Sequence, residues 1–208
     1  MENVIKEIAE PGEICFNRET GIYHTGTLSK KRQRVVGDDM LTEQDIEFNP
    51  ALQRKLMQDA VDAFNRNEQY LLKNRVNERC MCQRLAEYLG RGLAGTQYVV
   101  DVEYNRGMNG NESSEKRLDG KCVSLDIVVH KREYDADGRG FSNLICAEMK
   151  KASNPKGCTE DEERLRKLTD CAYGFCYQAG FMLLADDVSD KKELSIKAVF
   201  QDGCQIEE

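Results

Sequence analysis

Charged residues inside two apolar segments are the feature that most limits what this chain can fold into. The segments are VSLDIVVH (Val123–His130) and NLICAEMKK (Asn143–Lys151), and both have the length of buried strands. Asp126 lies in the middle of the first segment, and Glu148 and Lys150 lie near the end of the second. Because ionised side chains are rarely buried unless they are paired or bind a metal ion, the segments predict a metal site or an ion-pair network.

Strand periodicity brings the three charges together. Successive side chains of a strand point to opposite faces, so Glu148 and Lys150 share one face. One face of the first strand is fully aliphatic and is formed by Val123, Leu125, Ile127 and Val129. Asp126 lies on the other face of the same strand. The intervening segment, Glu133–Gly140, has the composition of a hairpin loop. If the hairpin packs its aliphatic faces together, Asp126 joins Glu148 and Lys150.

Two helices are predicted before these strands. Asn49 as N-cap and Pro50 at the first helical position start an amphipathic helix that runs to about residue 66. The helical pattern resumes over 68–89, and glycines end it. Glu78 falls on the apolar stripe of this second helix, with Leu71, Cys82, Leu85 and Leu89. Such an acid either pairs with an arginine at the edge of the stripe or faces a polar pocket.

The remaining pattern predicts strands at 97–105, 175–185 and 194–201, a polar loop at 106–119 and a helix at 160–171. A capping box at Thr159–Glu162 starts that helix, and Arg164, Arg166 and Lys167 are expected on its exposed side. The order of elements predicts an α/β fold with a mixed central β-sheet flanked by helices.

Residues 50–208 are expected to form one domain, preceded by an N-terminal extension over 1–49. The extension contains a possible hairpin within Glu13–Gly26 and a basic cluster, Lys30–Arg34. The basic cluster predicts either a solvated flexible arm or an arm that contacts phosphates.

Composition limits the class of protein and its compartment. No apolar run reaches about 18 residues, so no transmembrane helix is expected, and the N-terminus lacks the apolar core of a signal peptide. We therefore expect a cytoplasmic protein that does not enter a membrane. The nine cysteines are an odd number and several lie in apolar stretches, which favours small buried hydrophobes over disulfides. A net charge of −7 neither indicates nor excludes a nucleic-acid partner.

Asp126 and Glu148 on one face would suit Mg²⁺ (or Mn²⁺), which one or two carboxylates hold together with phosphate oxygens of a substrate. A neighbouring Lys150 could orient or help deprotonate the attacking water and offset charge on the phosphate. The alternative is a cross-strand salt bridge from Lys150 to Asp126 or Glu148. Glu103 could face the same pocket, although a salt bridge with Arg106 is the simpler expectation.

At these residues the chain resembles the PD-(D/E)XK phosphodiesterase superfamily, which has the restriction-endonuclease-like fold. The resemblance implies that Glu78 is the helix acid, Asp126 the central metal ligand, Glu148 the second ligand and Lys150 the catalytic lysine. The wider sequence also resembles an uncharacterised bacterial and phage branch of this superfamily. The matching pieces are NERCMCQRLAEYL (Asn77–Leu89), VDVEYNR (Val100–Arg106), LDIVVHKR (Leu125–Arg132) and ICAEMKKASN (Ile145–Asn154).

The resemblance covers roughly residues 68–185, and Leu125 stands where the family pattern has a proline before the aspartate. Three hypotheses follow. The first is a Mg²⁺-dependent nuclease that acts on DNA rather than RNA. Its phosphate contacts would come from Lys150, Lys151 and Lys156, together with the Lys30–Arg34 arm. The second is a catalytically inactive fold that binds nucleic acid or protein. The third is a structural protein whose strand charges are plain salt bridges. The sequence indicates no oligomeric state.

Overall fold

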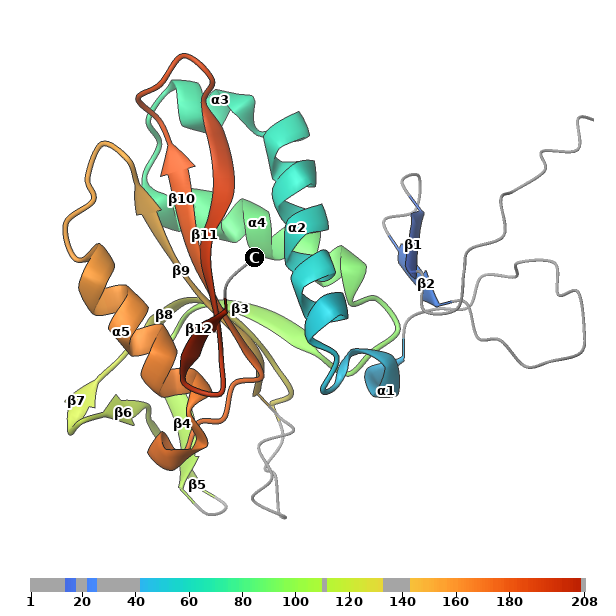
Figure 1. The fold of residues 1–208 in the computed structure, drawn as a ribbon, viewed down its shortest axis with the longest axis vertical. Coiled ribbons are helices and arrows are strands. Elements are labelled where there is room, and N and C mark those ends of the chain that lie inside the picture. Colours follow the sequence, from blue (N-terminus) through green and yellow to red (C-terminus); the bar gives the residue numbers. More distant parts are fainter. Residues whose placement is uncertain (1–13, 18–21, 26–41, 110–111, 133–142, 207–208) are drawn as a thin grey trace, which may run out of the picture.

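The computed structural model describes residues 14–17, 22–25, 42–109, 112–132 and 143–206. At its centre is a six-stranded sheet with the strand order β12-β11-β10-β9-β8-β3 (Figure 1). Strands β9 and β10 pair parallel, and the other neighbours pair antiparallel. The predicted mixed α/β sheet is therefore confirmed. The strands are β3 Val99–Tyr104, β8 Leu125–His130, β9 Asn143–Lys151, β10 Ala179–Asp186, β11 Glu193–Gln201 and β12 Cys204–Ile206.

Helices cover both faces of this sheet (Figure 1). Helices α2 (Pro50–Asn67) and α4 (Glu78–Gly92) share one apolar core with every second residue of the strands, such as Ile127 and Ala147. Helix α5 (Cys158–Thr169) packs on the other face, over the alternate residues Val128 and Cys146 among others. Because both faces are covered, the central strands are apolar on both sides.

The start of helix α2 follows from its local sequence. The Asn49 side chain accepts a hydrogen bond from the amide of Leu52 at 3.1 Å, and Pro50 occupies the first helical position, as predicted. The predicted apolar face is buried from Leu52 to Phe64. A short helix, α1 (Glu43–Ile46), precedes it, and its Ile46 is fully buried in the same core. The packed unit therefore includes residues before Pro50.

The second predicted helix is wrong as one continuous element. It is split into α3 (Gln69–Lys73) and α4, and Arg75 between them has a left-handed φ of 52°. The Asn77 side chain caps α4 by accepting a hydrogen bond from the amide of Cys80 at 2.8 Å. Since an N-cap starts a new helix, Glu78 is the first residue of α4 and does not share a helical stripe with Leu71.

The polar segment after β3 is also more structured than predicted. It forms β4 (Arg106–Asn109) and β5 (Glu112–Glu115), which pair antiparallel, and then the short pair β6 (Arg117–Leu118) and β7 (Lys121–Cys122). Its glycine and asparagine content indicated turns and concealed the short strands that those turns connect.

The expected N-terminal hairpin is present as β1 (Ile14–Asn17) and β2 (Ile22–Thr25), which pair antiparallel. The turn between them, the basic cluster Lys30–Arg34 and the predicted loop Glu133–Gly140 lie outside the described residues. None of the helices in the part of the chain that the structure describes is a candidate for a membrane-spanning segment.

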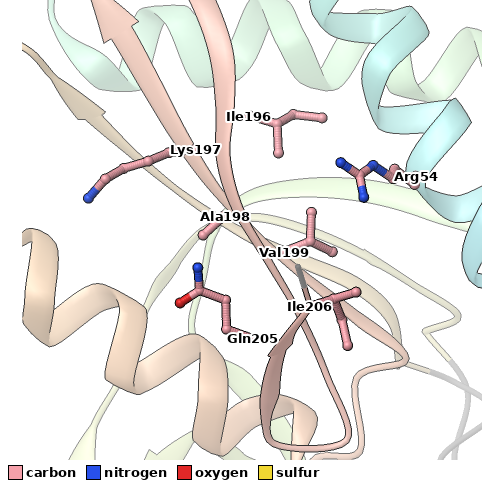
Figure 2. Close-up of a pocket in the computed structure, with 7 residues that line it drawn as sticks. All are labelled: Arg54, Ile196, Lys197, Ala198, Val199, Gln205 and Ile206. Carbon is pink, nitrogen blue, oxygen red and sulfur yellow. The ribbon is translucent and has the colours of Figure 1, made fainter. Parts of the chain in front are cut away.

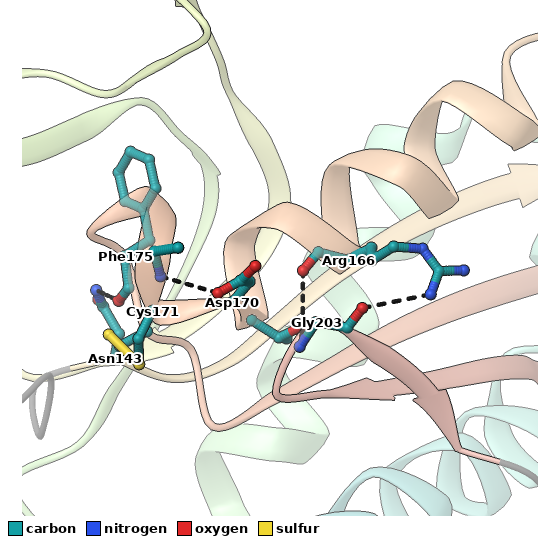
Figure 3. Close-up of a disulfide and its surroundings, with 9 residues drawn as sticks. Asn143, Arg166, Asp170, Cys171, Phe175 and Gly203 are labelled. Atoms are coloured by element: carbon teal, nitrogen blue, oxygen red, sulfur yellow. Dashed lines mark hydrogen bonds between the residues drawn. A yellow bond between two sulfur atoms is a disulfide. The ribbon is translucent and has the colours of Figure 1, made fainter.

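Helix α5 begins at Cys158, after Gly157 in the left-handed conformation (φ 83°), so the predicted capping box at Thr159–Glu162 is wrong. The helix ends in a tight loop with a 3-10 turn, Cys171–Tyr173. The loop is fastened by the amide of Ala172, which donates to Asp170, and by the Asn143 side chain, which donates to the carbonyl of Phe175 at 2.7 Å (Figure 3). The strand expected from 175 therefore starts only at 179.

The same loop holds a disulfide between Cys171 and Cys176 (Figure 3). The expectation that the cysteines form no disulfide is therefore wrong for this pair, which is brought together by the turn rather than by the core. Of the free cysteines, Cys82 and Cys146 are buried as small hydrophobes, whereas Cys122 is exposed.

Candidate active site

Asp126 and Glu148 lie opposite each other on adjacent strands. The antiparallel pairing of Ile127 with Ala147 places Asp126 across from Glu148, one step along the ladder. The Asp126 carboxylate accepts a hydrogen bond from the amide of Met149 at 2.8 Å, which fixes it against β9. Both acids lie on the face of the sheet that α5 covers. Strand periodicity predicted that the two acids would share a face.

Burial and mutual repulsion govern these two acids. Glu148 is 2% exposed, and burial together with the charge of Asp126 raises its pKa to about 8. Burial also raises the pKa of Asp126, although hydrogen bonds from the Met149 amide and the Glu148 carboxyl oppose the shift. The two carboxyl groups therefore favour a state with one proton or with a bound cation between them.

Helix α5 adds two charged residues to the site. Arg164 forms an ion pair with Glu148 (Nη1 to Oε1, 2.5 Å), and Asp161 forms one with Lys150 (Oδ2 to Nζ, 2.7 Å). Arg164 also contacts Asp161 at 3.2 Å, which links the two pairs. The prediction that Arg164 lies on the exposed side of its helix is therefore wrong.

Asp161 and Arg164 are functional candidates that sequence reasoning missed. One signal was present, because Asp161 precedes Leu165 and Leu168 on the apolar stripe of α5 and is itself buried. No comparable signal existed for Arg164, which reaches the site from the side of the stripe.

Lys150 forms its ion pair with Asp161 and not with either strand acid, so the alternative of a cross-strand salt bridge from Lys150 to Asp126 or Glu148 is not observed. Burial acts to lower the pKa of Lys150, but the ion pair with Asp161 and the charges of Glu78 and Asp126 outweigh it and raise that pKa. Lys150 is therefore a cation in this state, suited to stabilising negative charge rather than to accepting a proton.

Glu78 reaches the site from the N-terminus of α4. Its Oε1 accepts a hydrogen bond from the amide of Lys151 at 3.1 Å. The Lys151 side chain returns to the same end of the helix and donates to the carbonyls of Arg75 and Val76 at 3.0 and 3.2 Å. These contacts tie the start of α4 to the end of β9, next to Lys150.

Cys82 of α4 is buried between this helix and β9. Burial raises its pKa, and the charges of Asp126, Glu148 and Glu78 raise it further. Cys82 contacts Met149 through sulfur at 3.8 Å, on the side of β9 that faces α4. Cys82 therefore lies on the α4 face of the sheet, opposite the face that carries Asp126 and Glu148.

Glu103 lies across from Asp126 on the other neighbouring strand, between the paired residues Val102 and Tyr104. It has a left-handed φ of 52°, a strained conformation for a residue with a side chain. It forms an ion pair with Arg79 of α4 at 3.0 Å, and not the expected one with Arg106. Its charge contributes to the raised pKa of Asp126.

The donor chemistry of the pair fits a hard divalent cation. Carboxylate oxygens are the ligands that Mg²⁺ and Mn²⁺ prefer, and Mg²⁺ is commonly held by only one or two of them. Within the part of the chain that the structure describes, no three or more His, Cys, Asp or Glu side chains are arranged to hold a metal ion. The fit therefore rests on Asp126 and Glu148, and Glu78 is not brought in as a third ligand.

A pocket of about 200 Å³ lies elsewhere, at the β11–β12 end of the sheet (Figure 2). Its walls include Arg54 of α2 with the apolar side chains of Ile196, Val199 and Ile206. Strand β10 separates β11 from the strand that carries Glu148, so this pocket is not part of the acidic site.

The chain matches no family model, no curated protein and no solved structure.

Proposed function

We propose that this chain is a divalent-metal-dependent nuclease that hydrolyses phosphodiester bonds, of DNA rather than RNA, on a restriction-endonuclease-like core of the PD-(D/E)XK type. One observation carries the proposal. Asp126, which is half-buried, and Glu148, which is buried, lie opposite each other on the central strands β8 and β9, with Lys150 on the same strand face as Glu148.

The balance of charge in the cluster supports a cation. Three carboxylates, those of Asp126, Glu148 and Asp161, face two cationic groups, those of Lys150 and Arg164. Burying unbalanced negative charge is costly unless a proton or a metal ion neutralises it. The cluster has one carboxyl group more than it has cationic groups, so either a proton on the Asp126–Glu148 pair or a bound cation would balance it.

Each residue then has a role. Asp126 and Glu148 would hold Mg²⁺ or Mn²⁺, which when bound polarises the phosphoryl oxygen and lowers the pKa of a coordinated water. Lys150, as an ammonium group, stabilises negative charge that builds on the phosphoryl oxygens in the transition state. Glu78 fixes the backbone of Lys151 and with it the end of β9, so that Lys150 keeps its position.

The proposal is tested by incubating the protein with supercoiled plasmid, single-stranded DNA and RNA, in the presence of Mg²⁺ or Mn²⁺ and with EDTA. Cleavage should require the cation and fall by about 100-fold or more in Asp126→Asn and Lys150→Ala. Lys191→Ala is the matched control, since Lys191 is 83% exposed and pairs only with Glu193 among the described residues. Cleavage that survives EDTA, or that Lys150→Ala retains in full, would refute the assignment.

A second candidate is an inactive fold of the same type that binds nucleic acid or protein. The observation in its favour is that Glu148 and Lys150 already have ion-pair partners on α5. Calorimetric titration with Mn²⁺ separates the two candidates, because the nuclease requires cation binding that Asp126→Asn abolishes and the inactive fold does not.

We assign the protein to the cytoplasm as part of this proposal. The described residues include six free cysteines, of which Cys122 and Cys204 are exposed, which suits a reducing compartment. The Cys171–Cys176 disulfide is the feature that opposes this assignment.

A further inference from the structure

Two charged residues of helix α5 and two of strand β9 form a chain of ion pairs over the site. Asp161 and Arg164 are one turn apart on α5, and Glu148 and Lys150 are neighbours on one face of β9. Arg164 contacts Glu148 and Asp161 at 2.5 and 3.2 Å, and Asp161 contacts Lys150 at 2.7 Å. Both cations contact Asp161, but Arg164 also contacts Glu148, so Arg164 bridges two acids and Lys150 is held by one.

We propose that Arg164 is the phosphate-binding group of this site, and that its ion pair with Glu148 couples phosphate binding to cation binding. The proposal rests on the proposed function. In the cation-free state, Arg164 contacts Glu148. When Asp126 and Glu148 instead share a cation, Arg164 is released from Glu148 while its contact with Asp161 keeps it beside the site.

The chemistry of arginine suits this exchange. A guanidinium group offers several N–H donors in a planar fork that matches two oxygens of a phosphate, so it can replace one carboxylate partner by a phosphodiester. The Arg164 side chain is 29% exposed, whereas Glu148 is almost completely buried. The exposed part of the arginine gives it access to a ligand at the surface, and the tether to Asp161 limits how far it can move.

Coupling of this kind has two measurable consequences. Arg164 competes with the cation for Glu148, so removing it should tighten cation binding in the absence of nucleic acid. Free Arg164 also favours the phosphodiester only when the cation is bound, so each ligand should increase affinity for the other by the same factor. A purely structural Arg164 predicts the opposite first result, because its loss would loosen the site.

The experiment is calorimetric titration of Mn²⁺ into wild type, Arg164→Gln and Arg164→Lys, each with and without a single-stranded hexanucleotide carrying phosphorothioate linkages. Arg164→Gln should bind Mn²⁺ about 5- to 10-fold more tightly than wild type without the oligonucleotide. The oligonucleotide should tighten Mn²⁺ binding in wild type and have no effect in Arg164→Gln. Arg164→Lys keeps the charge and should leave Mn²⁺ affinity within about 2-fold of wild type while weakening the effect of the oligonucleotide.

Arg66→Gln makes the same change of charge at an exposed position on α2 and should match wild type throughout. Thermal melting of every variant verifies folding, and Arg164→Lys provides the answer if Arg164→Gln does not fold. If Mn²⁺ binding depends on Asp126 but is unchanged or weaker in Arg164→Gln, the role of Arg164 is overturned and the proposed function stands. Wild-type protein that binds no Mn²⁺, or binds it equally after Asp126→Asn, overturns both.

Discussion

Lys116 provides a quantitative test of the forces in this fold, because it is a buried lysine without a carboxylate partner among the described residues. It is 2% exposed and donates a hydrogen bond to the hydroxyl of Tyr177 at 2.5 Å. Its ammonium nitrogen lies 4.8, 5.4 and 5.5 Å from the ring centroids of Tyr177, Tyr104 and Phe175. Three aromatic rings thus replace the water and the carboxylate that a lysine normally has.

Burial lowers the pKa of Lys116 from 10.5 to about 8. A difference of one pKa unit corresponds to 1.36 kcal/mol, so the charged lysine costs the folded state about 3 kcal/mol at neutral pH. Between pH 8 and 10.5 the unfolded chain binds a proton at this lysine that the folded protein does not. The free energy of unfolding therefore rises with pH across this window, because the unfolded state binds more protons.

Lys116→Met keeps the length of the side chain and removes the charge. We expect the free energy of unfolding of wild type, minus that of Lys116→Met, to increase by about 3 kcal/mol between pH 7 and pH 10.5. The neighbouring groups that also titrate, namely His130, Cys146, Tyr104 and Tyr177, are common to both proteins and largely cancel in this difference.

The assay is urea unfolding followed by far-ultraviolet circular dichroism at pH 7, 8, 9, 10 and 10.5, with midpoints converted to free energies. Lys121→Met, at an exposed lysine of β7, is the control and should give a difference independent of pH. A wild-type minus Lys116→Met difference that stays constant within about 1 kcal/mol would refute the reasoning, because it would mean that the rings stabilise the ammonium group as well as water does.

Two further predictions concern backbone positions that support the site. Asn77→Ala removes the acceptor for the amide of Cys80 and should lower the free energy of unfolding by about 1 kcal/mol in urea titrations, with Asn77→Ser recovering most of it; no loss would mean that the cap does not hold α4. Gly180→Ala places a methyl group 3.1 Å from Thr169 of α5 and should destabilise by about 1–3 kcal/mol. Its control, Gly90→Ala in α4, meets only Val100 at 3.9 Å and should stabilise by about 0.5–1 kcal/mol. Melting temperatures that shift in the same direction for both glycines would contradict this packing argument.

The sequence predicted those parts of the site that depend on local pattern. Strand alternation placed Asp126 and Glu148 on one face, and the structure pairs the strands accordingly. The Asn49–Pro50 start of α2 was also correct, because an N-cap acts through residues within one turn. The prediction of one continuous helix over 68–89 was wrong for a related reason. It followed the hydrophobic periodicity and overlooked a second local cap, at Asn77, which starts a new helix.

Partners of the charged residues could not be predicted in the same way. Glu103 pairs with Arg79 of α4 rather than with Arg106 nearby in sequence, and Lys150 pairs with Asp161 rather than with a strand acid. Each of these partners comes from a different element, so its position depends on how the elements pack and not on spacing along the chain.

By itself, then, the sequence determined the order of the main strands and helices and the presence of charge within β8 and β9, because the first follows from periodicity and the second can be read directly from the residues. Only the tertiary structure decided how that charge is balanced. The parallel pairing of β9 with β10 requires a crossover between them, and α5 is that crossover. Lying across the face that carries Glu148 and Lys150, it brings Arg164 and Asp161 to within ion-pair distance of them.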